Sequence, residues 1–517
     1  MSKMINKYSY LTLCAAITAI FSLLMLSAGC EDDDSPTAVK DTVRDTARDT
    51  TVDTVTQTAM IYAHAINFDD AKGSAGNLVT DHYLNGDLNI ASCIINSIGN
   101  PDLEVTTAEQ IIKFSGVSDT LPGTMTLGRK DSVVAKMDAN NYFNTDAGVT
   151  RDNLLPTAGG AAFTSARQPL PTGDPFFETA DYIGAFNATN WMAWTYYSQA
   201  QAGAITDDTT TKETKVITDD SVATGKDLVL SADTTYILDG FVFVESGAAI
   251  TIQPGTVIKA EPGGQLNASA LIICRGGKII AQGTSDAPII MTAKQDDLKY
   301  QDDINSTARG LWGGLIVLGS AVTQRAAGVE QIEGIDPNDT RGEYGGTVDD
   351  DSSGVITYVS IRYGGTNIGE GNEINGLTMG GVGNKTVIHN VEVFNNSDDG
   401  FEFFGGAVNT KRLCAIGCGD DSYDWDEGFR GKGQFWVVVQ SDDAGDRAAE
   451  MDGCASNNRG DVTRYSKPTI YNTTFIGSGA ESGNDGNMAM KLREETGGYY
   501  YNCIFTDFAG ALKIVNP

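Results

Sequence analysis

Three short acidic segments recur at a fixed interval in the middle of the chain. They read SDDGFEFF, GDDSYDWD and SDDAGDRA, and their paired aspartates begin at equally spaced positions. In each segment a further acid follows three residues after the pair. The nine carboxylates in register are Asp398, Asp399, Glu402, Asp420, Asp421, Asp424, Asp442, Asp443 and Asp446. This repeat predicts either a binding site or a solvated acidic face.

Carboxylates that stack on one another favour a bound cation. If successive repeats lie one strand spacing apart, about 4.8 Å, two unit charges repel by roughly 3 kcal/mol at an effective dielectric of 20. Ca²⁺ offsets such repulsion and prefers oxygen ligands, whereas zinc prefers histidine and cysteine. The residue after each Asp-Asp pair is small and leaves room for an ion. We therefore predict a Ca²⁺ site, centred on the first two repeats around Asp420, Asp421 and Asp424.

Two aromatic residues occupy equivalent places in the first two repeats. Phe403 and Trp425 are separated by the same interval as the acids, and each directly follows the third acid of its segment. Rings at these places could stack on a sugar and bind substrate, but aromatic residues in a repeat more often pack in its core. Both interpretations stay open at the level of the sequence.

Composition excludes several classes of function. The 517 residues carry a formal net charge of −32 and three histidines. Nucleic acid and anionic lipid surfaces both require basic patches, so neither is an expected ligand of the folded part. The chain has no HExxH and no GxxxxGKS/T motif. Histidine-based zinc chemistry, a nucleotide-binding P-loop and a Ser-His-Asp triad are therefore disfavoured.

The acidic segments lie within a run of short repeated strands. Similar apolar stretches recur at regular spacing: FVFV at 241–244 and LIIC at 271–274, then VEVFNN at 391–396, LCAIGC at 413–418 and FWVVVQ at 435–440, then NTTFIGSG at 472–479 and NCIFTDFAG at 502–510. Self-similarity with variable insertions indicates stacked coils. Leucine-rich repeats lack support, because no LxxLxLxxN pattern is present. We predict an all-β fold, a right-handed parallel β-helix over residues 216–517, in which the three acidic segments stack on one face.

The first residues predict export. Residues 1–29 combine Lys3 and Lys7 with an apolar run, which is typical of a signal peptide. The sequence LSAGC at 26–30 resembles a bacterial lipobox, which implies lipidation of Cys30 and attachment to a membrane. Residues 30–57 form an Asp/Thr-rich tether that cannot build a core. The acidic run after Cys30 resembles export tags of surface lipoproteins, so we expect an outer-membrane lipoprotein, on the cell surface in preference to the periplasmic face.

Residues 58–215 form a predicted smaller N-terminal region of mixed structure. The stretch 106–116 has a threonine cap and helical spacing, and it predicts a helix. The aromatic stretch 179–199 predicts core or a cap, with a binding site as the alternative. At the other end the sequence stops at GALKIVNP, inside an expected strand, and we expect an uncapped final coil or one covered by a partner. Cys418 and Cys454 flank the acidic segments as a disulfide or as buried thiols.

Residues from about 235 to 475 resemble the pectin-lyase-like superfamily of right-handed parallel β-helices. The phrases YILDGFVFVESGAAITIQPGTVIKA, RGLWGGLIVLG and DEGFRGKGQFW carry this resemblance. They also resemble uncharacterised bacterial surface β-helix lipoproteins. The resemblance implies the fold, whereas functions in the superfamily range from polysaccharide lyases and hydrolases to adhesins.

The Asp-Asp-x-x-Asp pattern is similar to the calcium motif of family 9 pectate lyases. The resemblance implies calcium ligands at Asp398 or Asp399 with Asp420, Asp421 and Asp424. It also implies a basic side chain that removes a proton from a uronate, for which Lys432, Arg430 and Arg447 are the candidates. Three functions follow as expectations: a calcium-stabilised β-helix that binds polysaccharide or another surface partner, a calcium-dependent polysaccharide lyase, and a structural or adhesion lipoprotein.

Overall fold

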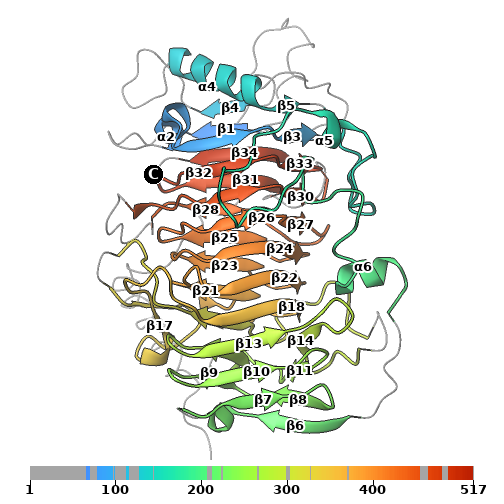
Figure 1. The fold of residues 1–517 in the computed structure, drawn as a ribbon, viewed down its shortest axis with the longest axis vertical. Helices are drawn as coiled ribbons and strands as arrows, with labels where there is room; N and C mark the ends of the chain where they lie inside the picture. Colours follow the sequence, from blue (N-terminus) through green and yellow to red (C-terminus); the bar gives the residue numbers. More distant parts are fainter. Residues whose placement is uncertain are drawn as a thin grey trace, which may run out of the picture. The chain divides into compact units, whose positions relative to one another are not determined.

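The computed structural model describes the strands, turns and helices that build two long parallel sheets (Figure 1). Described residues are 66–69, 79–96, 98, 112–115, 127–143, 145–205, 212–222, 225–264, 267–298, 303–325, 328–369, 372–454, 464–479 and 487–515. All of them belong to one compact unit, Thr51–Pro517. The predicted signal peptide, Cys30 and the tether lie outside the described residues.

The first sheet, which we call sheet A, contains eleven strands that pair in parallel. Its spatial order is β4-β1-β34-β31-β28-β25-β23-β21-β15-β12-β9. The bounds are β1 Ile66–Asp69, β4 Ile112–Ser115, β9 Phe241–Val244, β12 Ala270–Ile273, β15 Leu315–Leu318, β21 Leu377–Gly380, β23 Phe401–Phe404, β25 Tyr423–Asp426, β28 Glu450–Asp452, β31 Met488–Arg493 and β34 Gly510–Val515.

The second sheet, sheet B, contains nineteen strands. They are β2 Leu88–Ala91, β3 Ile94–Asn96, β5 Tyr142–Phe143, β6 Glu213–Ile217, β7 Leu228–Leu230, β8 Thr234–Leu238, β10 Ala249–Ile252, β11 Val257–Ala260, β13 Lys278–Gln282, β14 Ile289–Ala293, β18 Gly354–Arg362, β22 Val387–Phe394, β24 Asn409–Ile416, β26 Lys432–Gln434, β27 Val437–Val439, β29 Thr469–Tyr471, β30 Thr474–Ile476, β32 Gly498–Tyr501 and β33 Ile504–Thr506.

Short helices and two small ladders project from these sheets. The helices are α2 Val79–Asn85, α4 Leu127–Asn140, α5 Ala161–Thr164 and α6 Tyr196–Gln201, with 3₁₀ turns at Asp219–Val222 and Thr340–Gly342. The ladders are antiparallel, and they join β16 Glu330–Gln331 to β17 Glu343–Tyr344 and β19 Asn367–Gly369 to β20 Asn372–Glu373.

One residue in the left-handed conformation bends each long strand of sheet B. Tyr358, Asn390 and Arg412 have φ of 51°, 54° and 53° within β18, β22 and β24. Non-glycine residues adopt this conformation rarely, and asparagine does so most readily. The repeated bend turns each strand from one face of the coil to the next, so the chain winds as a β-helix. The predicted all-β parallel β-helix is confirmed.

Residues alternate between the interior and the outside along each sheet-A strand. In β23 and β25, Phe401, Phe403, Tyr423 and Trp425 are buried, whereas the residues between them face outward. The interior rings stack from coil to coil, with Phe401 and Tyr423 centroids 5.3 Å apart at 12°. Phe403 and Trp425 are 0% and 1% exposed. The prediction that they bind substrate is therefore wrong, because the period of two directs them into the core.

Pairing registers correct the spacings inferred from sequence. Val242 pairs with Leu271, and Ile250 pairs with Ile279. The spacing inferred from the sequence is one residue too long, so it would shift both pairings by one residue. The predicted step from β23 to β25 is confirmed, since Glu402 pairs with Asp424. The next step is longer than the repeat predicts, since Cys414 pairs with Val437, the residue after the expected one. Asp424 pairs with Glu450 and not with Asp446.

Strands from the N-terminal region cover the final coil. β1 pairs in parallel along β34, with Ile66 opposite Leu512 and Asp69 opposite Val515, and β4 pairs on the far edge of β1. β2 and β3 extend sheet B against β32 and β33. The expectation of an uncapped final coil is wrong, because an edge strand pairs with whichever strand has free backbone groups. The helix predicted at 106–116 is also wrong where the structure describes it, at strand β4.

A long irregular segment, residues 145–205, lies along the outer face of sheet B; we call it the strap. Its Ile183, Phe186 and Met192 are buried in one cluster with outward residues of β24 and β27. Gly184 has φ of 92°, and a Cβ there would lie 2.5 Å from Ile504, so only glycine fits. The stretch predicted as core or cap therefore serves as a cap over sheet B.

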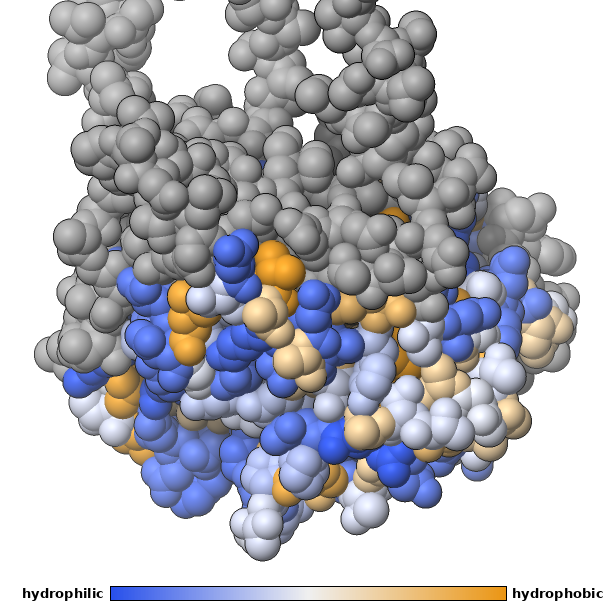
Figure 2. Space-filling model, turned by 90° about the horizontal axis from the view of Figure 1, so that it is seen from above, coloured by the Kyte–Doolittle hydropathy of each residue, from blue (hydrophilic) through white to orange (hydrophobic). Residues whose placement is uncertain are grey.

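Seen from the end that carries α4, the coloured surface is mostly hydrophilic, with hydrophobic residues scattered among polar ones (Figure 2). Among the described helices, none is long and apolar enough to cross a bilayer. The six cysteines within the described residues are buried free thiols, so Cys418 and Cys454 are not joined.

Candidate metal centre

The acidic pairs lie in the turns that lead from sheet B into sheet A. Asp398 and Asp399 precede β23, and Asp420 and Asp421 precede β25 (Figure 1). The third acids, Glu402 and Asp424, are outward residues of these strands and pair directly across them. The first two repeats therefore form two adjacent rungs, as predicted.

Hydrogen bonds fix the inner row of the site. The Asp421 amide donates to Asp399 Oδ1 at 2.9 Å, and the Arg447 amide donates to Asp421 Oδ1 at 2.6 Å. The Asp446 amide donates to the Asp420 carbonyl at 3.1 Å. Because each coil repeats the same turn, these bonds place Asp399, Asp421 and Arg447 in one row and Asp420 beside Asp446.

The third repeat does not stack as predicted. Asp442 pairs with Arg151 at the molecular surface, and Asp443 forms an ion pair with Arg309 at 2.8 Å. Asp446 reaches the site, but it lies beside Asp420 and not below Asp424. The turn between β27 and β28 is longer than its predecessors, so extending the earlier interval displaced every residue of the third repeat.

Seven of the nine predicted carboxylates gather in one place, which we call the acid site. Three overlapping groups have ligand atoms within 4.8 Å of one another: Asp398 with Asp399 and Asp420, Asp399 with Glu402 and Asp424, and Asp420 with Asp421 and Asp446. The members of the acid site are Asp398, Asp399, Glu402, Asp420, Asp421, Asp424 and Asp446.

Burial makes ionisation of these acids unfavourable. Loss of solvent, followed by repulsion from neighbouring carboxylates, raises the pKa of Asp399, Glu402 and Asp424 well above the usual range. The same causes raise the pKa of Asp398 and Asp421. Arg447 offsets only part of the effect at Asp421. A cation is therefore needed if these groups are to be charged together.

The rung below the acid site is neutralised by the protein itself. Glu450, which is paired with Asp424 across the strands, is 3% exposed and lies 3.0 Å from Arg447 and 2.6 Å from Arg493. Lys491 is 3.3 Å away. Burial opposes its ionisation, yet Arg493, Lys491 and Arg447 together hold its pKa below the usual value. Arg447 extends this charge compensation to Asp446, at the edge of the acid site.

Loops inserted between coils add polar groups above the first rung. The Asn375 amide donates to Glu333 at 3.2 Å and to Glu402. Burial raises the pKa of Glu333 to about 7. The charges of Glu333 and Glu373 raise the pKa of Asp398 further. These residues enlarge the acidic region towards the antiparallel ladders.

Sequence reasoning missed the residues of the lower rung and of the loops. The segments FEFF, YDWD, EMD and KLR all alternate inward and outward residues, and an alignment places an outward residue of each in the same column. Such an alignment would have found Glu450, Lys491 and Arg493. Glu333 and Asn375 gave no periodic signal, because they lie in insertions or at a turn.

Two of the three predicted basic residues lie away from the acid site. Lys432, in β26 of sheet B, pairs with Asp174 of the strap. Arg430 forms an ion pair with Asp349 at 3.1 Å. Only Arg447 contacts the site, where it is 5% exposed and pairs with Asp446 and Glu450.

Comparisons with known proteins support the fold. Searches of curated proteins and of solved structures found no match. A family model described as a pectate-lyase-like beta helix domain matches residues 222–517, more than half of the chain. The match includes the acid site and every strand that forms it. The chain belongs to the pectate-lyase-like β-helix family.

Proposed function

We propose that the acid site binds Ca²⁺ and that this exported, lipid-anchored β-helix uses the ion to hold a polysaccharide or another surface partner. One observation carries the proposal: in the upper two rungs Asp399, Glu402 and Asp424 bring their ligand oxygens within 4.8 Å of one another. Among the described residues, Asp399, Glu402 and Asp424 form no ion pair with lysine or arginine. At Glu450 the same fold instead places arginine and lysine beside a buried carboxylate.

The donor chemistry favours Ca²⁺ over transition metals. Every member of the acid site offers oxygen, and no histidine or cysteine belongs to the three groups of possible ligands. Ca²⁺ tolerates irregular geometry and accepts about six to eight oxygens, so it suits carboxylates that come from three turns and two strands. Mg²⁺ demands a smaller octahedral cage and keeps more of its water.

A melting experiment tests the metal site. Ca²⁺ in excess over EDTA should raise the melting temperature, because it binds the folded site and hardly the unfolded chain. At about 100 times the dissociation constant the gain is about 2.7 kcal/mol. The double variant Asp421→Asn with Asp424→Asn should lose most of the gain. Identical wild-type curves in EDTA and in Ca²⁺ would overturn the proposal.

The third acidic segment provides a matched control. Asp442→Asn removes one carboxylate from the same sequence pattern, but its side chain is 73% exposed and outside the acid site. This variant should keep the full response to Ca²⁺. A loss of response here would mean that calcium acts through general surface charge.

The structure favours binding over a calcium-dependent lyase. β-Elimination needs a base, which here would be a basic side chain that is deprotonated near neutral pH. Among the described residues, the basic side chains that contact this face are Arg447, Lys491 and Arg493, and all three pair with Glu450. Burial opposes protonation of Arg493, but Asp452 and Glu450 raise its pKa. We therefore expect no unsaturated product from a panel of uronate polymers with Ca²⁺, measured by absorbance.

Export and anchoring rest on the sequence of residues 1–30. The apolar run and the lipobox-like LSAGC support lipidation at Cys30. Cys30→Ser should release the protein from the membrane fraction, as measured by fractionation and immunoblotting. Retention of an unprocessed chain would indicate a plain membrane anchor.

A further inference from the structure

We infer that a second site, a cavity between the strap and the turns that follow sheet B, binds a neutral saccharide without calcium. The cavity has a volume of about 740 Å³ and is separate from the acid site. Cavities of about 300–1,000 Å³ are typical of small-molecule sites. Its lining comes from residues 151–152 and α6 of the strap, from the loop at 306–307, and from the ends of β22, β24 and β27 with the turn at 441–443.

The floor of this cavity is a column of apolar side chains. Phe394 pairs with Ile416, and Ile416 pairs with Val439, so the three lie on successive coils at the ends of their strands. All three line the cavity. Phe394 packs edge-on against Tyr196 at 4.8 Å and Tyr363 at 5.8 Å between ring centroids, which fixes its ring. A rigid apolar column suits the CH face of a sugar ring.

Two amide side chains and a glycine lie beside the apolar column. Asn395, Gly417 and Gln440 directly follow the three apolar residues in the chain, and all line the cavity. Gln440 is 2% exposed, and among the described residues its Oε1 has no hydrogen-bond partner. A buried amide acceptor left in this way is costly, and a hydroxyl donor from a ligand would satisfy it.

Of the four charged residues that line the cavity, Arg151, Asp442 and Asp443 are already paired. Arg151 binds Asp442, and Arg309 holds Asp443 with its guanidinium at 2.8 Å and 3.1 Å. An anionic ligand would have to displace one of these carboxylates and then face the others, and a cation would have to displace an arginine. A neutral ligand with many hydroxyls can hydrogen-bond to these ion-paired groups without displacing any of them. Asp152, at the exposed rim, adds one more acceptor.

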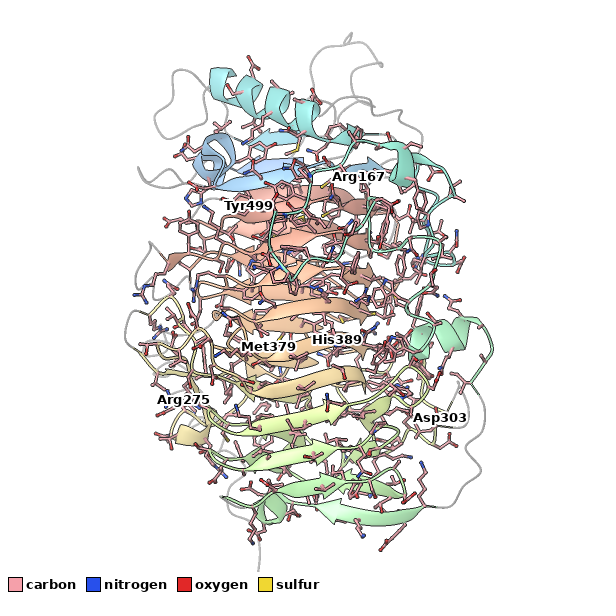
Figure 3. All side chains as sticks on the ribbon, in the orientation of Figure 1. Arg167, Arg275, Asp303, Met379, His389 and Tyr499 are labelled. Carbon is pink, nitrogen blue, oxygen red and sulfur yellow. The ribbon has the colours of Figure 1, made fainter. Side chains whose placement is uncertain are left out.

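The mouth lies on the side of the strand stack that carries α6. Figure 3 labels Asp303, which shortly precedes Ser306 in the chain, on the same side as α6 in Figure 1. Tyr197 and Gln201 of α6 line the cavity, and the Tyr197 hydroxyl donates to the Arg151 carbonyl at 2.6 Å. The strap thus supplies one wall and the β-helix the other, so the site requires the whole folded unit.

Titration calorimetry in EDTA tests the inference, with cellobiose, maltose, lactose and xylobiose as neutral probes and digalacturonate as the charged one. At least one neutral disaccharide should bind. Ala200→Trp places a bulky ring in the cavity from α6 and should weaken binding tenfold or more. Ala202→Trp, outside the lining, is the matched control and should bind as the wild type does.

Circular dichroism establishes whether Ala200→Trp folds. Gln201→Ala gives a second test, because it shortens an exposed side chain at the rim of the cavity. We expect this variant to bind the disaccharide several-fold more weakly. No binding by any neutral probe at millimolar concentration, tighter binding of digalacturonate, or unchanged affinity in both cavity variants would overturn the inference. Because EDTA is present throughout, a negative result in this calorimetry does not bear on the calcium proposal. Likewise, the melting experiment with Ca²⁺ does not test the saccharide site.

Discussion

Two glutamates in one column of sheet A have opposite surroundings, and they should respond oppositely to the same change. Glu450 pairs with three basic side chains, so Glu450→Gln removes a buried negative charge from among them and should destabilise the protein by about 3 kcal/mol or more. Glu402→Gln removes an uncompensated charge and should leave the calcium-free protein equally or more stable. Urea denaturation in EDTA measures both, and a similar loss in both variants would contradict the assignment of charge.

A second buried carboxyl predicts a pH dependence. Burial, followed by the charge of Glu330, raises the pKa of Glu427 to about 8, and the Tyr344 hydroxyl donates to it. The unfolded value is about 4.3. Since the folded state binds this proton more tightly, its contribution to stability is present below the unfolded value and is lost as pH rises towards about 8.

Glu427→Gln mimics the protonated form and should reduce this loss. Between pH 5 and pH 9 the melting temperature of the wild type should fall more than that of the variant, as differential scanning fluorimetry in EDTA can measure. Glu261→Gln, which affects an exposed pair with Lys294, should follow the wild type. Parallel curves for all three proteins would show that Glu427 is ionised across this range.

At the scale of strands, the N-terminal cap removes an exposed edge. Without β1, the backbone groups along β34 would lack their ladder partners. Deleting residues 58–144 should lower the melting temperature and cause concentration-dependent self-association, measured by size exclusion with light scattering. A chain that begins at residue 58 keeps β1 and should remain as stable as the full chain. A monodisperse deletion variant would contradict this role of the cap.

The sequence predicted the elements where the pattern is local. Alternation in FEFF and YDWD, small residues in the turns and the constant step between these two segments led to the β-helix and to two rungs of the acid site. The prediction for Asp442 and Asp443 was wrong because their local pattern copies the earlier segments. The longer turn before β28 shifts the pairing of the strands, so these two aspartates do not stack on the earlier pairs. The pairing of β1 with β34 left no signal, since so short a strand does not specify a partner so distant in sequence.

For the folded unit as a whole, net charge and the metal site make separable contributions. A formal charge of −32 implies long-range repulsion, which any salt screens. At equal ionic strength, CaCl₂ should therefore raise the melting temperature of the wild type more than NaCl does. In the Asp421→Asn, Asp424→Asn variant the two salts should have nearly the same effect. Equal effects in the wild type would mean that calcium acts only by screening.

The pairing of Ile66 with Leu512 has a consequence for the order of events during synthesis. One edge of β1 can pair early with β4, but its other edge must wait for β34, since nearly all the strands of the fold lie between β1 and β34 in the sequence. Contacts so distant in sequence close late and slowly. The interior coils can wind as they emerge, whereas the cap can close only once the chain is nearly complete. Until then one edge of the N-terminal strands remains available to other partners.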